Sequence, residues 1–247
     1  DLPVDAPRRS PRQENAPVYI YVETMDTYAA GKGQNFDDTM EQLLLRKYGH
    51  RGFDLVVAVG DRPIDFLLPR STKMFPKAKV LYTAVFHHPV AGVPGVIMEP
   101  NLLPTAEMAL RQNPGTRRVL LISGSSDSDR PGIVQLKEDL QGRLTRTGRA
   151  VKVETLPPMT YAGAHQYMST LPRDMVGIFV YYFGDSAGQV VNPTRAISEF
   201  SGLCPRPIYS MWEADVGLGA MGGQVISTTG SAKPCTLSTR SLHSIKK

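Results

Sequence analysis

The sequence predicts an α/β fold made of two Rossmann-like lobes with parallel sheets. Short apolar runs alternate along the chain with longer amphipathic stretches, which is typical of repeated strand–helix–strand units. Several of the runs are apolar at successive positions, as expected for strands covered by helices on both faces. The alternation pauses in the Pro- and Gly-rich residues 86–104 and then starts again, which indicates a second lobe.

The predicted strands are β-branched or aromatic and are bounded by Gly, Pro, Asp or Ser. In chain order they are Val18–Val22, Asp54–Val59, Val80–Val85, Val119–Ile122, Val151–Val153, Gly177–Tyr182, Ile208–Ser210 and Gln224–Ser227.

The predicted helices fill the stretches between these strands. In the first, Asn35–Tyr48, acids in the first turn and bases in the last suit the helix dipole. Pro114-Gly115 and Gly148 each end a helix. The other predicted helices are Pro63–Leu68, Thr105–Gln112, Gly132–Thr147, Tyr161–Leu171 and Pro193–Phe200.

This order divides the chain into three parts. We expect an N-terminal lobe over residues 1–100, a C-terminal lobe over 101–222, and a return segment with a basic tail over 223–247. Two lobes of this class direct the carboxyl ends of their strands toward a shared interlobe cleft, where small ligands usually bind.

The composition fits a folded, water-soluble segment. The chain has 247 residues, 41% of them hydrophobic, and no apolar run approaches the roughly 18 residues of a membrane span. Its net charge is +5, but residues 228–247 contribute Lys233, Arg240, Lys246 and Lys247 with no acid; the rest of the chain has 24 bases and 23 acids. A nearly neutral body argues against nucleic acid as a partner.

The cysteines and the start of the chain indicate little about the compartment. A disulfide between Cys204 and Cys235 is compatible with an exported protein, but no zinc-ligand spacing occurs. No signal peptide is visible after Asp1, so the chain is either cytoplasmic or processed.

Two further motifs have ordinary interpretations. The glycines of Gly217–Gly222 match GxGxxG, but a strand-like run follows them and no acid occurs after Asp215, so we expect a turn and no cofactor. His87-His88 lacks further ligands at metal-binding spacing, and no GxSxG elbow is present, so neither a metal nor a catalytic residue is expected.

Polar residues follow several of the predicted strands. Ser123, Gly124 and Ser125 follow one strand and are suited either to contact an anionic group or to form a solvated loop. Asp61 follows an earlier strand, where it is either a helix N-cap or a ligand contact.

Two later strands end in aromatic and acidic residues. Tyr182 precedes Asp185 in one of them, and Trp212 precedes Glu213 in the other. An aromatic wall beside a carboxylate suits a flat or amine-bearing small molecule, whereas the alternative is packing within the lobe.

Five segments carry a resemblance to a known family: FDLVVAVGDRPIDFLL, FPKAKVLYTAVF, AEMALRQNPGTRRVLLISGSS, VYYFGDSAGQVVNP and PIYSMWEADVGLGAMGGQVIS. Over about residues 18–227 the chain resembles the extracytoplasmic substrate-binding proteins of ABC transporters, including the aromatic-amino-acid-binding members. It is most similar to the branch that forms the sensor domain of membrane histidine kinases.

The resemblance implies the two-lobed periplasmic-binding fold and a ligand held by loops after the strands. Those loops correspond to Gly60-Asp61, Thr83-Ala84, Ser123–Ser126, Tyr182–Asp185 and Ser210–Glu213. The family pattern begins with a strand and a helix before the segment that matches VYIYVETMD, where this chain has only DLPVDAPRRSPRQENA. We therefore expect the first strand to be missing, and the Ser/Thr-rich tail also departs from the family's closing helix.

These observations predict an extracytoplasmic, non-enzymatic binding domain that closes around a small molecule such as an amino acid or an aromatic acid. The resemblance favours the input domain of a histidine kinase, whose partner is its own transmembrane and kinase region, with a homodimer left open. One alternative is the solute-binding component of an ABC transporter, with a membrane permease as partner. Another is an α/β enzyme.

Overall fold

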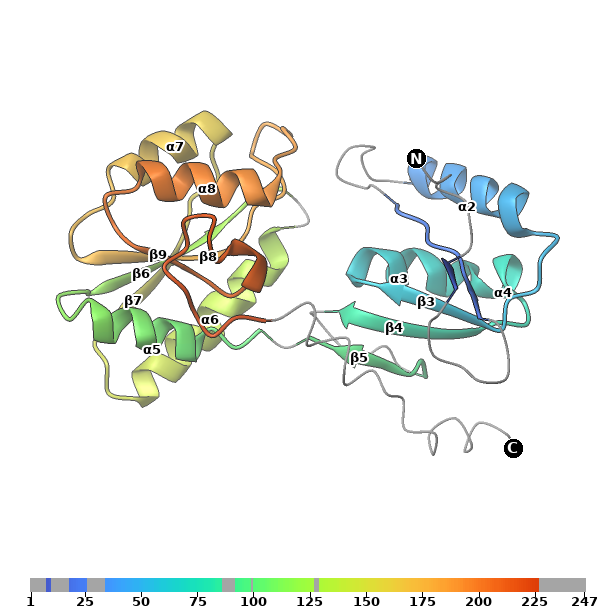
Figure 1. Ribbon diagram of the computed structural model, residues 1–247, viewed down its shortest axis with the longest axis horizontal. Coiled ribbons are helices and arrows are strands. Elements are labelled where there is room, and N and C mark those ends of the chain that lie inside the picture. Colours follow the sequence, from blue (N-terminus) through green and yellow to red (C-terminus); the bar gives the residue numbers. More distant parts are fainter. Residues whose placement is uncertain are drawn as a thin grey trace. The chain divides into compact units, whose positions relative to one another are not determined.

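The structure is a computed structural model that describes residues 8–9, 18–25, 34–85, 92–98, 100–126 and 129–226. The chain divides into two compact units, residues 1–50 and 51–247. Figure 1 labels the helices and strands in chain order.

The first unit combines a short ribbon and one helix. β1 (Arg8–Arg9) pairs antiparallel with β2 (Tyr19–Ile20). Of the strand predicted at residues 18–22, only Tyr19 and Ile20 therefore pair with another strand. The predicted helix is confirmed as α2 (Gln34–Tyr48), with Asp37 in its first turn and Lys47 in its last. The Lys47 ammonium lies 2.9 Å from the Glu23 carboxylate, which also accepts a hydrogen bond from the Tyr48 hydroxyl.

The second unit begins with a parallel sheet in the order β3-β4-β5. β3 (Leu55–Val59) and β4 (Lys79–Val85) confirm two predicted strands, whereas β5 (Gly95–Ile97) lies in the Pro- and Gly-rich stretch that was predicted to contain none. Gly95 is required there, because a Cβ would lie 2.4 Å from the Tyr82 ring. The helical segments between β3 and β4 are α3 (Asp61–Leu67), η1 (Leu68–Arg70) and α4 (Ser71–Met74).

A second parallel sheet has the order β7-β6-β8-β9. Its strands are β6 (Arg118–Ser123), β7 (Lys152–Thr155), β8 (Met175–Tyr181) and β9 (Ile208–Ser210). The accompanying helices are α5 (Leu103–Gln112), α6 (Arg130–Arg146), α7 (Tyr161–Ser169) and α8 (Pro193–Leu203). All of these elements overlap the predicted ones and differ by a few residues at their ends.

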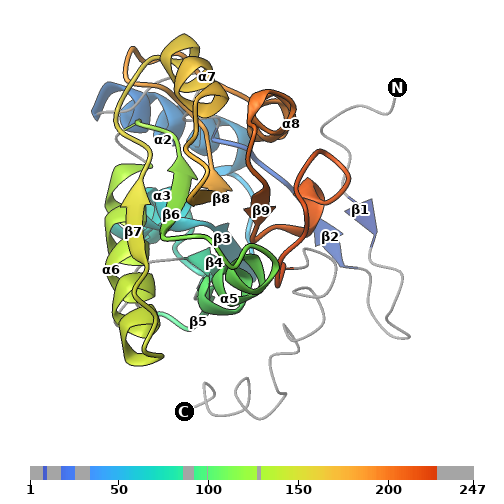
Figure 2. The same cartoon turned by 90° about the vertical axis from the view of Figure 1, so that its left-hand side faces the viewer.

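Helices cover both faces of this sheet, α5 and α6 on one side and α7 and α8 on the other (Figures 1 and 2). Alternate strand residues therefore enter two separate cores. Val119 and Leu121 pack with residues of α5 and α6, whereas Leu120 and Ile122 pack with residues of α7 and α8. All four are fully buried, which explains why this strand is apolar at every position.

The last described residues lie against the second sheet and α5. The Gln224 amide donates to the Thr105 hydroxyl at 3.0 Å, and the Ile226 amide donates to the Met211 carbonyl at 2.7 Å. Only an isolated bridge between Ile226 and Trp212 marks the strand predicted at Gln224–Ser227. Of the return segment and basic tail predicted over residues 223–247, only residues 223–226 belong to the described part of the chain.

The GxGxxG match forms a turn after η2 (Glu213–Asp215), and no helix follows it before residue 226. Gly217, Gly219 and Gly222 all have positive φ, and a Cβ on Gly219 would lie 2.5 Å from the Ser201 side chain. The interpretation as a turn with close backbone packing agrees with this geometry, because a dinucleotide motif needs a strand before it and a helix after it.

Some sequence predictions fall outside the described residues. These are the His87-His88 pair and Cys235, whereas Cys204 is half-buried just after α8. Among the helices that the structure describes, none is long and apolar enough to cross a membrane.

Candidate functional site

The polar residues predicted after β6 and β8 lie together at the carboxyl edge of the second sheet. The Gly124 amide donates to the Tyr181 carbonyl at 3.0 Å, and the Ser125 amide donates to the Gly184 carbonyl at 2.7 Å. β6 and β8 are neighbours whose following helices, α6 and α8, cover opposite faces of the sheet. This is the switch point at which open α/β sheets bind ligands.

The loop after β6 is fixed by a close approach at Gly124. A Cβ on this residue would lie 2.1 Å from the Asp129 Oδ2 and 2.6 Å from the Gly184 carbonyl oxygen. Ser123 is buried, and its hydroxyl donates to the Gly124 carbonyl at 3.2 Å. Only glycine therefore lets this loop pack directly against both the carboxylate and the neighbouring loop.

Asp129 is a buried carboxylate, 1% exposed, behind this loop. The Ser126 hydroxyl donates to it at 2.8 Å. Burial raises the pKa of Asp129, whereas the Ser126 hydroxyl and the backbone amides of Ser126, Gly184 and Phe183 lower it. The Tyr181 hydroxyl in turn donates to the Asp129 carbonyl at 3.0 Å, so both loops are anchored to the start of α6.

A register shift at the end of β8 decides which aromatic rings lie at this edge. Tyr182 belongs to the core beneath α7 and α8, where its ring packs edge-on against Phe200 at 5.3 Å. Tyr181 and Phe183 are half-buried on the opposite side and stack at 6.1 Å with an interplanar angle of 21°. Val180 and Tyr181 both pack against the core beneath α5 and α6, so the alternation of side chains is broken there, and Tyr182 enters the opposite core.

Tyr182 is fully buried, and its hydroxyl has no hydrogen-bond partner among the described residues. Burial and, to a smaller extent, the charges of Asp185 and Asp129 raise its pKa to about 12. The phenol is therefore neutral at physiological pH, and its role as a ligand contact stays a prediction.

Asp185 is 2% exposed, and its carboxylate accepts three backbone hydrogen bonds. Its Oδ1 accepts from the amides of Ala187 at 2.9 Å and Gln189 at 2.8 Å, and its Oδ2 accepts from the Tyr161 amide at 2.8 Å. The side chain thus shapes its own loop and caps the first turn of α7. Its predicted ligand contact is untested, and this structural use competes with it.

Trp212 lies next to β8, and its indole Nε1 donates to the Val180 carbonyl. The ring is half-buried against the core beneath α5 and α6. Glu213 is exposed at the start of η2, and its amide donates to the Ile226 carbonyl at 3.2 Å. The structure therefore places Trp212 beside the strand that carries Tyr181, and the predicted ligand contact of Glu213 stays a prediction.

A second buried acid supports the loop after β9. The Ser210 hydroxyl donates to the Asp215 Oδ2 at 2.5 Å and accepts from the Trp212 amide at 3.0 Å. Asp215 is buried, and desolvation raises its pKa, whereas the Ser210 hydroxyl lowers it.

This raised pKa makes Asp215→Asn a pH-dependent test. Because its raised pKa favours the protonated carboxyl in the folded state, Asp215 makes its full contribution to the free energy of unfolding below the unfolded pKa of about 4. This contribution is lost as the pH rises through the folded pKa. Measured from about pH 4 upward, the free energy of unfolding of the wild type minus that of Asp215→Asn should therefore fall as the pH rises. Urea denaturation across this range measures it.

Ser210→Ala provides the matched control, because it removes the donor that lowers the Asp215 pKa. The decline in stability should then extend to higher pH, with an overall loss because the Trp212 amide also loses its acceptor. A difference between wild type and Asp215→Asn that is flat or rises with pH contradicts the assignment.

The residues predicted in the first sheet also meet at a carboxyl edge. The Gly60 amide donates to the Thr83 carbonyl at 2.8 Å, which joins the end of β3 to β4. Gly60 itself is the N-cap, so Asp61 is the first helical residue of α3 and the N-cap interpretation of Asp61 is wrong. Thr83 is half-buried within β4, and Ala84 beside it has a φ of 56°, a strained value for a non-glycine residue.

The sequence interpretation did not identify several residues that build the second-sheet edge. Tyr181, Phe183 and Asp129 belong to it, and a strict count of alternation from the buried Met175 would have placed the first two in the core beneath α7 and α8, because the register shift at the end of β8 breaks the count. Asp129 carries no sequence signal either, because its burial depends on Gly124 and on the loop after β8. No group of three metal-ligating side chains occurs among the residues that the structure describes.

No protein-family model matches the chain, and no curated protein matches it. Solved structures that are similar include the ABC domain of Streptococcus pneumonia in complex with L-Trp, with 14% identity and a TM-score of 0.53 over 75% of this chain and 62% of that one. A conserved domain protein from Vibrio cholerae has 13% identity and a TM-score of 0.47, over 75% and 63%. The 5-methylthioribose transporter solute binding protein from Thermotoga lettingae has 15% identity and a TM-score of 0.43, over 74% and 56%.

This chain spans less than two thirds of the length of each of these proteins. At such identities the similarity concerns the fold alone, and we base it on the first structure, whose TM-score exceeds 0.5. The chain has an α/β fold with parallel sheets, like that of the ABC domain crystallised with L-Trp.

Proposed function

We propose that this chain is a small-molecule-binding domain and that its second-sheet edge contacts the ligand. The observation that carries the proposal is the joining of the Ser123–Ser126 loop to the Tyr181–Gly184 segment at the switch point of the sheet. This arrangement presents a polar loop and a stacked pair of aromatic rings on neighbouring strands. Ligand sites combine such apolar surfaces with a few fixed polar groups.

The proposed ligand is an amino acid or an aromatic acid. Tyr181 and Phe183 offer a flat aromatic surface, and the Ser125 hydroxyl makes no hydrogen bond within the described structure, so it is available to a ligand carboxylate. An aromatic ligand ring gains about 0.5–1.5 kcal/mol from such a surface beyond its area burial. The occurrence of L-Trp in the structurally similar ABC domain supports this ligand class.

Isothermal titration calorimetry with L-tryptophan, L-phenylalanine and L-leucine tests the proposal. We expect the aromatic amino acids to bind more tightly than L-leucine. Phe183→Ala should weaken aromatic binding about tenfold, the equivalent of 1.4 kcal/mol, and affect L-leucine less. Ser125→Ala should weaken all three alike, because it removes a hydrogen bond to their common carboxylate.

Tyr167→Ala is the matched aromatic control, since this half-buried ring lies on α7, which covers the opposite face of the sheet from α5 and α6. It should leave each affinity unchanged. The proposal fails when a folded wild-type sample binds none of these ligands or other aromatic acids, or when Tyr167→Ala reduces binding as much as Phe183→Ala.

The cellular role of such a domain has two candidates. The resemblance of the sequence favours an extracytoplasmic sensor that passes ligand binding to a transmembrane and kinase region, with a homodimer as one mode of transmission. A solute-binding component that delivers its ligand to an ABC permease fits the same fold. A transmembrane segment and kinase domain in the same gene support the first role, and a neighbouring permease gene supports the second.

An enzyme on this fold is the remaining alternative, and turnover of a bound compound by the purified protein distinguishes it. A binding domain returns its ligand unchanged after incubation, as mass spectrometry of the recovered ligand shows.

A further inference from the structure

A shallow cavity of about 400 Å³, open to solvent, lies at the amino edge of the second sheet, at the opposite ends of the strands from the proposed ligand edge. The residue before β6, the residues that lead into β7 and the first residue of β7 line it together with the last turns of α6. The lining residues are Arg117, Gln141, Thr145, Arg149, Ala150, Val151 and Lys152. Three of them are bases and none is an acid.

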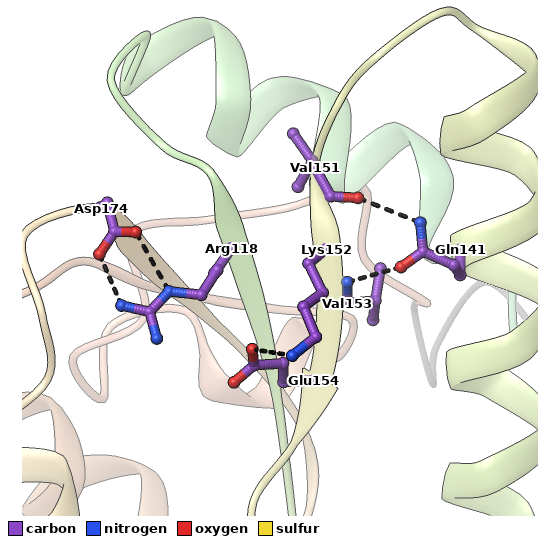
Figure 3. A network of polar contacts seen from close by, with 7 residues as sticks. All are labelled: Arg118, Gln141, Val151, Lys152, Val153, Glu154 and Asp174. Carbon is purple, nitrogen blue, oxygen red and sulfur yellow. Dashed lines mark hydrogen bonds and ion pairs between the residues drawn. The ribbon is translucent and has the colours of Figure 1, made fainter.

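The backbone around this cavity is held firmly. The Gln141 side chain donates to the Val151 carbonyl at 3.0 Å and accepts from the Val153 amide at 2.8 Å, which fastens α6 to the start of β7 (Figure 3). The Lys152 amide donates to the Arg117 carbonyl at 2.9 Å and joins the two strand starts. The three bases therefore project from ordered segments, so that ligand binding need not order the backbone.

The nearby acids are already paired. Arg118 contacts both carboxylate oxygens of Asp174, at 2.7 and 3.1 Å, and Glu154 lies 3.0 Å from the Lys152 ammonium (Figure 3). Arg117 and Arg149 are exposed, and neither forms an ion pair in the part of the chain that the structure describes. Lys152 is 72% exposed, so its surface ion pair is weak enough to yield to a second anion.

Bases near a helix C-terminus often only complement the helix dipole, and Arg149 follows the end of α6. That explanation does not cover Arg117 and Lys152, which come from strand starts. The dipole contributes roughly half a negative charge, whereas the cavity gathers three positive ones, so the local field favours an anion.

We propose that this cavity binds a phosphate group, carried either by a soluble small molecule or by a phospholipid headgroup. A phosphate monoester has up to two negative charges and three acceptor oxygens, which suit two arginine forks and one ammonium better than a single carboxylate does. The volume of this open cavity exceeds the needs of a single ion. This site is independent of the proposed ligand edge.

Binding of pyrophosphate measured by calorimetry at low salt is the first test, and cosedimentation with vesicles of phosphatidylglycerol or of phosphatidylcholine is the second. We expect the wild type to bind pyrophosphate and to lose most of that affinity when the salt rises from about 0.01 M to about 0.5 M. The double variant Arg117→Gln/Arg149→Gln should bind at least tenfold more weakly. Lys77→Gln/Lys79→Gln removes two exposed charges elsewhere and should bind like the wild type.

NMR spectroscopy of the wild type maps the site without any variant. Addition of pyrophosphate should change the amide chemical shifts of Arg117 and of residues 149–152. Cosedimentation with phosphatidylglycerol alone that depends on the same two arginines identifies a lipid headgroup, whereas pyrophosphate binding without cosedimentation identifies a soluble phosphate compound. The proposal is overturned when neither probe binds, when both double variants lose affinity equally, or when the shifts map elsewhere.

Discussion

Asp185→Ala should lower the free energy of unfolding by about 3 kcal/mol in the absence of any ligand. The buried carboxylate accepts hydrogen bonds from the amides of Ala187, Gln189 and Tyr161. Hydrogen bonds to a charged group each contribute about 1.5–3 kcal/mol, and amides left without an acceptor add a desolvation cost where water does not reach them. Urea denaturation at neutral pH measures the loss.

Asp185→Asn separates the two carboxylate oxygens. Its single amide oxygen can retain the bonds to Ala187 and Gln189, whereas the amide nitrogen cannot accept from Tyr161. We expect a smaller loss than for Asp185→Ala, because only the contact with α7 disappears. Asp139→Ala is the control, since it breaks a half-exposed pair with Arg143 on the surface of α6 that is worth at most about 1 kcal/mol.

The outcome decides what Asp185 is for. A stable Asp185→Ala protein that has lost aromatic amino acid binding would show that the residue contacts the ligand and that its structural role is minor. A protein that loses stability to the predicted extent places the residue in the scaffold of the loop after β8.

Gly124→Ala should destabilise the fold by about 3 kcal/mol. The new methyl group would lie 2.1 Å from the Asp129 Oδ2 and 2.6 Å from the Gly184 carbonyl oxygen. The loops after β6 and β8 would have to separate, with loss of the bond from the Ser125 amide to Gly184. Because this movement opens the proposed ligand edge, aromatic amino acid binding should weaken as well.

Gly142→Ala is the matched control for the same chemical change. Gly142 lies in α6, and a Cβ there would meet nothing within 4 Å. Alanine in a helix interior is favoured over glycine by about 1 kcal/mol, so this variant should be more stable than the wild type. Thermal denaturation of both variants should therefore give shifts of opposite sign, and a neutral Gly124→Ala would contradict the close packing of the two loops.

Local sequence patterns predicted most elements of the second sheet. β6 and β8 are continuous apolar runs, and a run of this kind gives the same signal whichever face each residue occupies. β5 was not predicted, because it is short and begins with a glycine. Gly95 fits over the Tyr82 ring, and this contact between two strands is not visible in the local sequence pattern.

The candidate site was predicted at the level of loops and only partly at the level of residues. Ser123, Gly124 and Ser125 lie where the strand-end pattern indicated, because the carboxyl ends of parallel strands meet at one edge. Tyr182 was chosen over Tyr181 and Phe183, although it faces the core beneath α7 and α8. The choice depends on which side of the strand each ring occupies, and a run apolar on both faces does not reveal it.

The sequence by itself determined the α/β class, the parallel strands and the loops that follow them, because periodicity and turn residues act over a few positions. Tertiary structure alone decided that Asp129 is buried against Gly124, that Asp185 caps α7, and that Arg117, Arg149 and Lys152 share one cavity. In the sequence these partners are separated by up to 35 positions, and only the packing of strands and helices brings their charges and hydrogen bonds within reach.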